Sequence, residues 1–373
     1  MITNPLKKLQ EYGQSIWLDY IQRSMLDEAL PRLIAEDGIR GVTSNPSILY
    51  EAISSSADYD QEIRRLARAG KSEAEIYDTL ALEDVGAAAD LFRPMFDESE
   101  GRHGFVSLEV SPHLAYDTQG TIAEARRYWA ALGRPNILIK VPATAQGLPA
   151  IRQLLAEGIN VNVTLLFGLP RYRQVLSAFL AGLEDRLAAG KPLAQVASVA
   201  SFFLSRIDVL IDPRLETRLK EGGERAPTAK RLLGQVAIAS ARRAYQIWKE
   251  VMATKRWLKL AEVGARPQRL LWASTSTKNP AYSDVKYVEA LIGPDTVNTL
   301  PLTTIEAYRD HGQPAPRLEQ DVDEALWVLD HLPDVGIDIR AVTQQLEDEG
   351  VQKFVTSYDQ LLALLRERRA QAA

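Results

Sequence analysis

The chain has 373 residues, of which 46% are hydrophobic and 25% charged, a globular composition with ample apolar material for a core. A formal net charge of −5 gives no overall basic field for holding nucleic acid, and no apolar run reaches the roughly 18 to 20 residues of a membrane span. Without cysteine there is no thiolate nucleophile or cysteine-ligated metal, and the start lacks the apolar core of a signal peptide. We therefore expect a cytoplasmic protein that binds neither nucleic acid nor membranes.

Short runs typical of buried β-strands alternate with longer helical segments along most of the chain. Apolar residues at helical spacing predict helices over 121–132 and 148–158, the second ended by Gly158. The repeated order of strand then helix predicts parallel strands. In chain order, the expected strands are 15–20, 40–45, 105–111, 136–142, 159–167, 197–203, 269–275 and 296–301.

The longer connections, near 46–104 and 207–268, are rich in helix formers rather than in Gly, Ser or Pro. They predict helical additions instead of linkers, as does the segment 302–373. About eight strands with crossover helices favour a closed (β/α)8 TIM barrel over an open sheet. We expect a single domain over 1–373, with additional N-terminal, inserted and C-terminal helices.

Polar side chains share one face of several predicted strands. In "FVSLEVS" (105–111), Glu109 and two serines lie opposite an apolar face of Val and Leu. The helices outside a barrel require the apolar face, so the polar face is expected to point inward. The same argument turns the lysine of "NILIKVP" (136–142) inward. The inward set from four strands is Asp19, Glu109, Lys140, Asn162 and Thr164.

Lys140 has a plain structural explanation, in which its amine reaches solvent at the strand end marked by Pro142. The convergence of polar residues from neighbouring strands favours a chemical one. Because dry surroundings disfavour the charged form of a lysine, we expect an uncharged amine that can attack a carbonyl carbon. The resulting protonated imine withdraws electrons, so an adjacent carbon–carbon bond can break without a metal or cofactor. Taken singly, Asp19 and Glu109 are better explained as structural caps or ion-pair partners.

Three other motifs favour structural explanations. The segment "AGKSEAEIYD" (69–78) resembles the end of a phosphate loop but lacks its upstream glycine, and Ser72 with Glu75 predicts a helix capping box instead. Basic and aromatic residues over 240–260 lie at helical spacing, which predicts a packed helix with a solvated basic face. The four histidines lack metal-ligand spacing, so we expect no metal.

The motifs that surround the inward set resemble those of the transaldolase family, in its longer bacterial form, within the class I Schiff-base aldolase superfamily. The resemblance covers nearly the whole chain, and the motifs follow the family's order. Each motif is weak alone, whereas the set is highly specific. They are "SIWLDYI", "GVTSNPSI", "SLEVSP", "ILIKVPAT", "INVNVTLLF", "ASVASFFLSRID" and "LLWASTSTKNPAY".

The resemblance implies a role for each matching residue. It makes Lys140 the Schiff-base lysine and Asp19 the group that takes the proton of the C4 hydroxyl. Glu109 and Thr164 are implied to handle the water of imine formation. The residues implied to hydrogen-bond the bound dihydroxyacetone unit are Asn45 and Asn162.

The phosphate site follows the family in part. Ser201 and Arg206 match its phosphate-binding positions, and Phe203 is expected to line the pocket. Shorter family members carry an arginine in the loop after the seventh strand, whereas "ASTSTKNP" (273–280) offers Lys278. A guanidinium matches phosphate geometry better than an ammonium does, so the change from arginine to lysine bears on phosphate binding. It does not affect the chemistry expected at Lys140.

The resemblance implies an enzyme of the pentose phosphate pathway, in its non-oxidative branch. It would move a dihydroxyacetone unit from sedoheptulose 7-phosphate to glyceraldehyde 3-phosphate, giving erythrose 4-phosphate and fructose 6-phosphate. Sugar phosphates are the expected partners, and a homodimer is implied. Two alternatives stay open: a class I aldolase that releases free dihydroxyacetone, and a non-catalytic sugar-phosphate-binding barrel.

Overall fold

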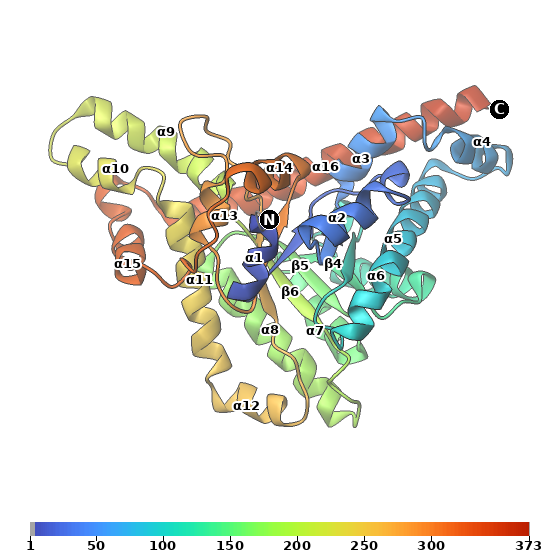
Figure 1. Cartoon of the computed structure of the whole chain (residues 1–373), viewed down its shortest axis with the longest axis horizontal. Coiled ribbons are helices and arrows are strands. Elements are labelled where there is room, and N and C mark those ends of the chain that lie inside the picture. Colours follow the sequence, from blue (N-terminus) through green and yellow to red (C-terminus); the bar gives the residue numbers. More distant parts are fainter. Residues whose placement is uncertain (1–3, 373) are drawn as a thin grey trace.

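A computed structural model describes residues 4–372 of the chain (Figure 1). Eight parallel strands follow one another around a closed barrel, with β1 paired to β8. This is the expected (β/α)8 architecture. The strands are β1 Gln14–Leu18, β2 Gly41–Thr43, β3 Phe105–Glu109, β4 Ile137–Pro142, β5 Val161–Leu166, β6 Ser198–Phe203, β7 Arg269–Ala273 and β8 Thr296–Leu300.

All eight expected strands are present, but several end earlier than the sequence suggests. Strand β1 stops at Leu18 rather than at residue 20, and β3 stops at Glu109 rather than at residue 111. The reason is that the backbone leaves the sheet where the barrel opens. Asp19 still donates its backbone N–H to the carbonyl of Leu300, at 2.8 Å, so the first residue past β1 remains anchored to β8.

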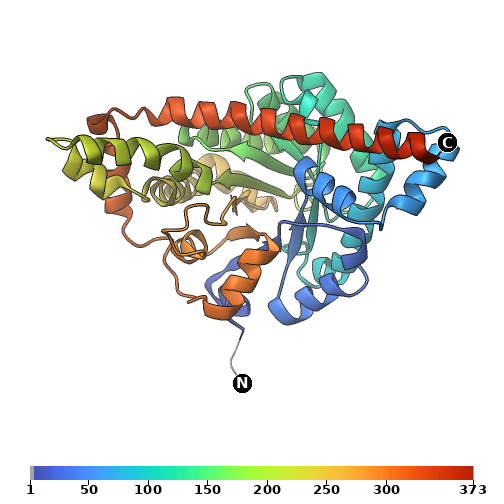
Figure 2. The ribbon, with the colours of Figure 1, turned by 90° about the horizontal axis from the view of Figure 1, so that it is seen from above.

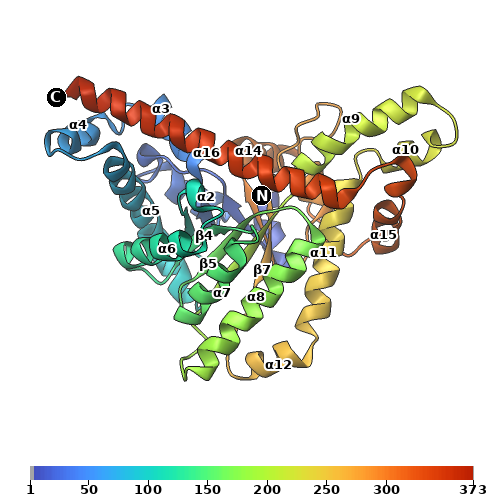
Figure 3. The ribbon, with the colours of Figure 1, turned by 180° about the vertical axis from the view of Figure 1, so that it is seen from behind.

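The helices lie outside the barrel, and several are additional to the basic fold, as expected (Figures 1 and 3). Helices α1 and η1 precede β1, α3 to α5 separate β2 from β3, α9 to α12 separate β6 from β7, and α14 to α16 follow β8. The bounds are α1 Pro5–Lys8, η1 Leu9–Tyr12, η2 Arg23–Met25, α2 Ala29–Asp37, α3 Pro46–Ser55, α4 Asp60–Arg68, α5 Glu73–Glu98, η3 Pro112–Leu114, α6 Thr118–Leu132, α7 Gly147–Glu157, α8 Leu169–Ala188, α9 Ser205–Glu221, α10 Ala226–Leu232, α11 Val236–Met252, α12 Lys255–Glu262, α13 Lys286–Ala290, α14 Leu302–His311, α15 Val322–Asp330, η4 Pro333–Val335 and α16 Ile339–Ala372. Within residues 4–372, every helix is too short or too polar to span a lipid bilayer.

The last helix, α16, runs across much of the molecule (Figure 2). It packs on α3, α4 and α5 from the first half of the chain and on α9 from the second. Its buried side chains include Val351, Phe354 and Leu361. A single rigid element therefore connects segments that are far apart in sequence.

The sequence predicts one helix over 240–260, and this is wrong in one respect. The chain forms α11 and α12 with a break between them, because the Thr254 hydroxyl accepts a hydrogen bond from the backbone N–H of Trp257 and starts a new helix. The other predicted helices are confirmed. Helix α7 ends at Glu157, and Gly158 follows with a φ of 91°, a left-handed conformation that suits glycine.

The barrel interior below the site is filled by aromatic packing. The ring of Trp17 is fully buried and lies over Gly41, where a Cβ would come within 2.7 Å of the indole. Glycine at this position of β2 therefore makes room for the tryptophan. The ring centroid of Phe105 lies 6.3 Å from that of Trp17.

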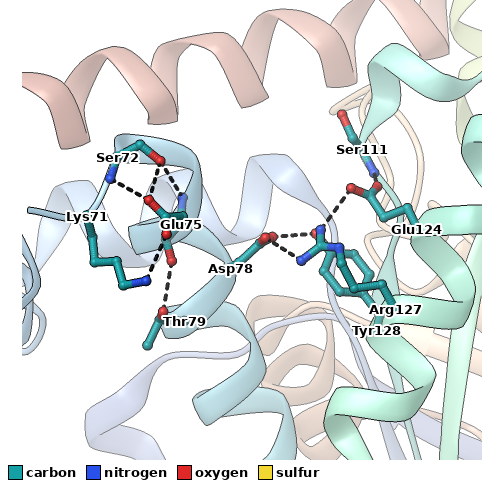
Figure 4. A network of polar contacts seen from close by, with 9 residues as sticks. All are labelled: Lys71, Ser72, Glu75, Asp78, Thr79, Ser111, Glu124, Arg127 and Tyr128. Atoms are coloured by element: carbon teal, nitrogen blue, oxygen red, sulfur yellow. Dashed lines mark hydrogen bonds and ion pairs between the residues drawn. The ribbon is translucent and has the colours of Figure 1, made fainter.

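A polar network ties α5 and α6 to the end of β3 (Figure 4). Helix α5 begins with the predicted capping box, in which the Ser72 hydroxyl accepts from the Glu75 backbone N–H and the Glu75 carboxylate accepts from that of Ser72. Further along, Asp78 pairs with Arg127 of α6 at 2.6 Å. Glu124, also on α6, accepts from the backbone N–H of Ser111, two residues after Glu109. The helix layer thereby fixes the strand end from which Glu109 projects.

Candidate active site

A cavity of about 700 Å³ opens at the carboxyl ends of the strands. This is the end of the barrel where enzymes of this architecture build their active sites. Residues from strands, from the following loops and from α3, α9 and α16 line it. Of the residues singled out from the sequence, the lining includes Asp19, Asn45, Lys140, Thr164, Ser201, Phe203, Arg206 and Lys278.

The remaining two residues of the predicted set, Glu109 and Asn162, are buried and flank Lys140 on the neighbouring strands. The strand register aligns Glu109 with Lys140 and Lys140 with Asn162 across β3, β4 and β5. Asn162 Nδ2 donates to the Ser107 hydroxyl at 3.1 Å, and the Ser201 hydroxyl donates to Asn162 Oδ1 at 2.7 Å. Strands β3 and β5 are not neighbours, so this link between Ser107 and Asn162 crosses the barrel interior.

Lys140 is held in a buried position with fixed partners. Its side chain is only 5% exposed, and Nζ donates to the backbone carbonyl of Ser44 at 2.9 Å. Oε2 of Glu109 lies 3.0 Å from the same Nζ, within ion-pair distance but outside hydrogen-bond geometry. Burial raises the pKa of Glu109 above its ordinary value, and the charge of Lys140 opposes that rise. A carboxyl with a raised pKa beside an amine is suited to exchange a proton with it.

Besides Glu109 Oε2, two buried oxygen atoms next to the lysine have no hydrogen-bond partner among residues 4–372. They are Glu109 Oε1 and Thr164 Oγ1. Thr164 lies where β5 carries a register shift between Val163 and Leu166, and Leu165 has a φ of 55°, which is strained for a branched side chain. Bulges of this kind redirect side chains at active sites. Both oxygen atoms can therefore bond a small polar group at the lysine.

Asp19 is the acceptor at the end of a hydrogen-bonded chain of hydroxyls. Thr43 Oγ1 donates to Asp19 Oδ1 at 2.7 Å and also lies 2.7 Å from Thr299 Oγ1. Because Thr43 has one hydroxyl proton and gives it to Asp19, Thr299 must be the donor to Thr43. Burial raises the pKa of Asp19, and the Thr43 hydrogen bond followed by the charges of Lys140 and Lys278 work against that rise.

Three cations gather at the mouth of the cavity. Arg206 begins α9, Lys278 follows β7, and Lys353 projects from α16. Burial lowers the pKa of each, and for the two lysines the charge of Arg206 is the next cause. Within the described chain, none of the three has a carboxylate within ion-pair distance. Like charges held together without counterions make an anion site.

The other predicted residues also have defined surroundings. Asn45 caps α3 through Oδ1, which accepts the Ile48 backbone N–H at 3.0 Å. Asn45 also lines the cavity. The ring of Phe203 packs against Phe167 at 5.2 Å between centroids and forms an apolar part of the wall.

Several lining residues are missing from the sequence-based set. Thr43 and Thr299 lie on predicted strands, but β2 has three residues, too few for alternation to reveal its inward face. Lys353 and Phe354 lie on α16, where the local pattern shows an amphipathic helix and nothing about the barrel end that it covers. Only the docking of α16 brings Lys353 to the site.

The fold and the site together define an α/β-barrel enzyme with a buried lysine between acidic groups at the catalytic end of the barrel. Residues 16–365 match the model of the family described as "Transaldolase/Fructose-6-phosphate aldolase". Similar proteins include "Transaldolase 2" of Nostoc sp., 48% identical over 97% of both chains. Another is "Transaldolase" of Saccharopolyspora erythraea, 47% identical over the full length of both. The chain therefore belongs to the transaldolase/fructose-6-phosphate aldolase family, and its activity is that of a transaldolase.

Proposed function

We propose that this site moves a dihydroxyacetone unit from sedoheptulose 7-phosphate to glyceraldehyde 3-phosphate. The products are erythrose 4-phosphate and fructose 6-phosphate, in the non-oxidative branch of the pentose phosphate pathway. The observation that carries the proposal is the buried amine of Lys140, which faces Glu109 at 3.0 Å and opens onto a cavity that Asp19 also lines. An amine in such surroundings is suited to form an imine with a ketose.

Imine formation requires a proton to leave the amine and a water molecule to leave the adduct. Lys140 Nζ attacks the C2 keto carbon, and the protonated carboxyl of Glu109 gives its proton to the former carbonyl oxygen, so that loss of the amine proton leaves a carbinolamine. Glu109 is the acceptor for the amine proton, and its raised pKa suits it to return that proton as the hydroxyl departs as water. Thr164 Oγ1 and Glu109 Oε1 would hold this water, because both atoms lack other partners among residues 4–372.

Cleavage then needs a base at the C4 hydroxyl. Asp19 takes that proton, the C3–C4 bond breaks, and its electrons move onto the iminium nitrogen to leave an enamine on Lys140. The released aldehyde is erythrose 4-phosphate. Addition of glyceraldehyde 3-phosphate and hydrolysis reverse these steps and restore the lysine. Asn45 and Asn162 would hydrogen-bond the three-carbon unit while the aldehydes exchange.

The cation trio of Arg206, Lys278 and Lys353 supports a phosphate site at the distal end of the bound sugar. We infer that Lys278 supplies the charge that a loop arginine supplies in shorter family members, and that Lys353 adds a second ammonium from α16. Ser201 and Phe203 contribute a hydroxyl and an apolar wall to the same cavity. We assign phosphate recognition to this group, because its repulsion is relieved when a dianion binds.

Borohydride reduction in the presence of fructose 6-phosphate, followed by peptide mapping, tests the lysine assignment. We expect a stable adduct on the peptide that contains Lys140, and none on the peptide that contains Lys278. In Lys140→Ala the adduct and turnover are lost while the far-ultraviolet circular dichroism is kept. A folded Lys140→Ala protein with wild-type transfer rate contradicts the proposal, and absence of any adduct favours a non-catalytic sugar-phosphate-binding barrel.

The same fold and lysine suit an aldolase, and the matching family model includes fructose-6-phosphate aldolase by name. The two reactions differ in the fate of the enamine. A transaldolase holds it until an acceptor arrives, whereas an aldolase protonates it and releases dihydroxyacetone. We expect little free dihydroxyacetone from fructose 6-phosphate alone and rapid turnover once an acceptor aldehyde is added. Full-rate release without acceptor supports the aldolase.

We also propose a homodimer, a cytoplasmic location and a single domain over 1–373, all of which the family resemblance supports. Light scattering during gel filtration tests the first. Thermal unfolding tests the last, because one domain is expected to unfold in a single transition.

A further inference from the structure

A second cavity, of about 620 Å³, lies at the opposite end of the barrel from Lys140. The amino-terminal halves of the strands contribute Ser15 of β1, Leu138 of β4 and Ser198 of β6 to its lining. We call it the basal pocket. It is separate from the proposed catalytic site, whose lining shares no residue with it.

The basal pocket is dominated by guanidinium groups. Arg40, Arg102, Arg266 and Arg269 all line it. Within residues 4–372, none of the four has a carboxylate within ion-pair distance. Most arginines elsewhere on this surface are paired, such as Arg256 with Glu184 at 2.7 Å. These four arginines without carboxylate partners therefore form a locally positive region in a chain whose formal net charge is −5.

Neutral groups hold two of these arginines in place without cancelling their charge. Arg269 donates from Nη1 to the Ser15 hydroxyl at 3.3 Å and from Nη2 to the carbonyl of Arg102 at 2.9 Å. Arg40 donates to the side chain of Gln10. The Ser15 hydroxyl also lies 3.1 Å from His103 Nδ1. The cluster is thus built from oriented side chains rather than from freely moving surface cations.

The pKa values of Arg269 and His103 are both lowered, as expected for basic groups that are buried near other positive charges. Burial lowers the pKa of Arg269 to about 10. The charge of Asp295 is the next cause and opposes this shift, and the charges of Arg40 and Arg102 add to it. Burial and the neighbouring arginines lower the pKa of His103 to about 3, so its ring is neutral near pH 7. An anion bound among these groups would relieve their repulsion.

The two acidic residues in the lining do not neutralise the positive charge of the four arginines. Glu100 and Asp295 are both exposed, and each is outnumbered by the arginines around it. A guanidinium presents paired N–H donors that match the oxygen atoms of a phosphate. A smaller cavity of about 420 Å³ shares Arg266 and Phe105 with the basal pocket and continues past Phe96 and Trp129. It offers an apolar surface for the uncharged part of a ligand.

We propose that the basal pocket binds a phosphorylated small molecule, with its phosphate groups between the four arginines and its remainder toward Trp129. Metabolites with two or more phosphate groups fit best, because several guanidinium groups converge on one cavity. Polyphosphate, nucleotide and sugar bisphosphate share this chemistry.

Calorimetric titration of the whole protein with inorganic pyrophosphate, ATP or fructose 1,6-bisphosphate tests the proposal and separates these sources. Binding at the catalytic cations is weakened in an Arg206→Gln, Lys353→Met background, which removes two of the three charges there. We expect at least one of the three probes to bind this background, with affinity lowered tenfold or more by adding Arg102→Gln and Arg266→Gln. When Arg102→Gln and Arg266→Gln are introduced into the otherwise unaltered enzyme, transfer activity measured without added probe should be unchanged.

Arg152→Gln with Arg256→Gln provides the matched control, because these arginines are paired with Asp185 and Glu184. The control should bind the probe as tightly as its background. Circular dichroism checks that each variant is folded, and Arg102→Gln alone, at an exposed position, serves if the double variant unfolds. No binding of any probe to the Arg206→Gln, Lys353→Met background, or binding that the distal variants leave unchanged, overturns the proposal.

Discussion

Glu109 and Lys140 face one another across the β3–β4 register, with Oε2 3.0 Å from Nζ and both side chains almost completely buried. A carboxyl this close to a buried amine can accept a proton from it and return that proton during the reaction. Chemistry at the lysine should depend on that carboxyl.

Glu109→Gln tests this dependence, because glutamine keeps the shape but cannot accept the amine proton. We expect kcat to fall by about 10²-fold to 10⁴-fold, the usual contribution of a general acid–base group. The rate of borohydride trapping with fructose 6-phosphate should fall with it. Trapping at the wild-type rate would show that another group moves the proton.

Asp19→Asn should separate imine formation from bond cleavage. The amide cannot take the C4 hydroxyl proton, so transfer should slow by about 10²-fold or more. The Lys140 adduct should still form and be trapped by borohydride, since Glu109 and Thr164 are intact. Loss of trapping together with turnover would argue against a role confined to cleavage.

Thr43→Val should move the acid limb of the pH profile of kcat/KM. The Thr43 hydrogen bond favours ionised Asp19 and so lowers its pKa, against the effect of burial. Without that bond the pKa of Asp19 rises further, less of the base is ionised at a given pH, and activity falls off at a higher pH than in the wild type. Thr43→Ser, which retains the hydroxyl, is the control and should keep the original limb. A limb at the same pH in all three proteins would exclude Asp19 as its origin.

Lys353→Met should weaken binding of phosphorylated ketoses while chemistry continues. Loss of one charged hydrogen bond, worth about 1.5 to 3 kcal/mol, corresponds to an increase in KM of about tenfold to a hundredfold. The value of kcat should change little. Lys71→Met, at an exposed surface lysine paired with Glu75, is the control for loss of a charge. Equal KM values in both variants would remove Lys353 from the phosphate site.

Asn45 combines helix capping with contact to the cavity, and two substitutions distinguish these functions. Asn45→Ala removes the cap of α3 and should lower the free energy of unfolding by about 1 kcal/mol. Asn45→Ser keeps a capping oxygen and should retain most of that stability. Both lack the amide, so both should raise KM for the ketose. An unchanged KM in Asn45→Ser would confine Asn45 to a structural role.

The sequence predicts the barrel because strand patterns and crossover helices recur in order from residue 15 to 301. The sequence also indicates Lys140 as a candidate functional residue, because burying an ammonium within an apolar strand such as "NILIKVP" is energetically costly. Alternation then selects Asp19 and Glu109 as its neighbours on the inner face. These inferences depend on local spacing, which the chain displays directly.

Contacts that depend on docking cannot be predicted in this way. The helical pattern around Lys353 is the same whether α16 covers the catalytic end or any other apolar surface. The ion pair of Glu109 with Lys140 depends on side-chain conformations as well as on strand faces. Strand ends such as Leu18 depend on where loops leave the barrel, and tertiary packing determines that point.

Helix α16 has a consequence for how this enzyme can change its substrate. The same rod that carries Lys353 and Phe354 to the cavity also packs against α3 and α9 on either side of it. Substitutions that reshape this cavity through the helix will be tolerated only where the contacts of α16 with its neighbouring helices survive. Reshaping the pocket and preserving the fold are therefore coupled along a single element.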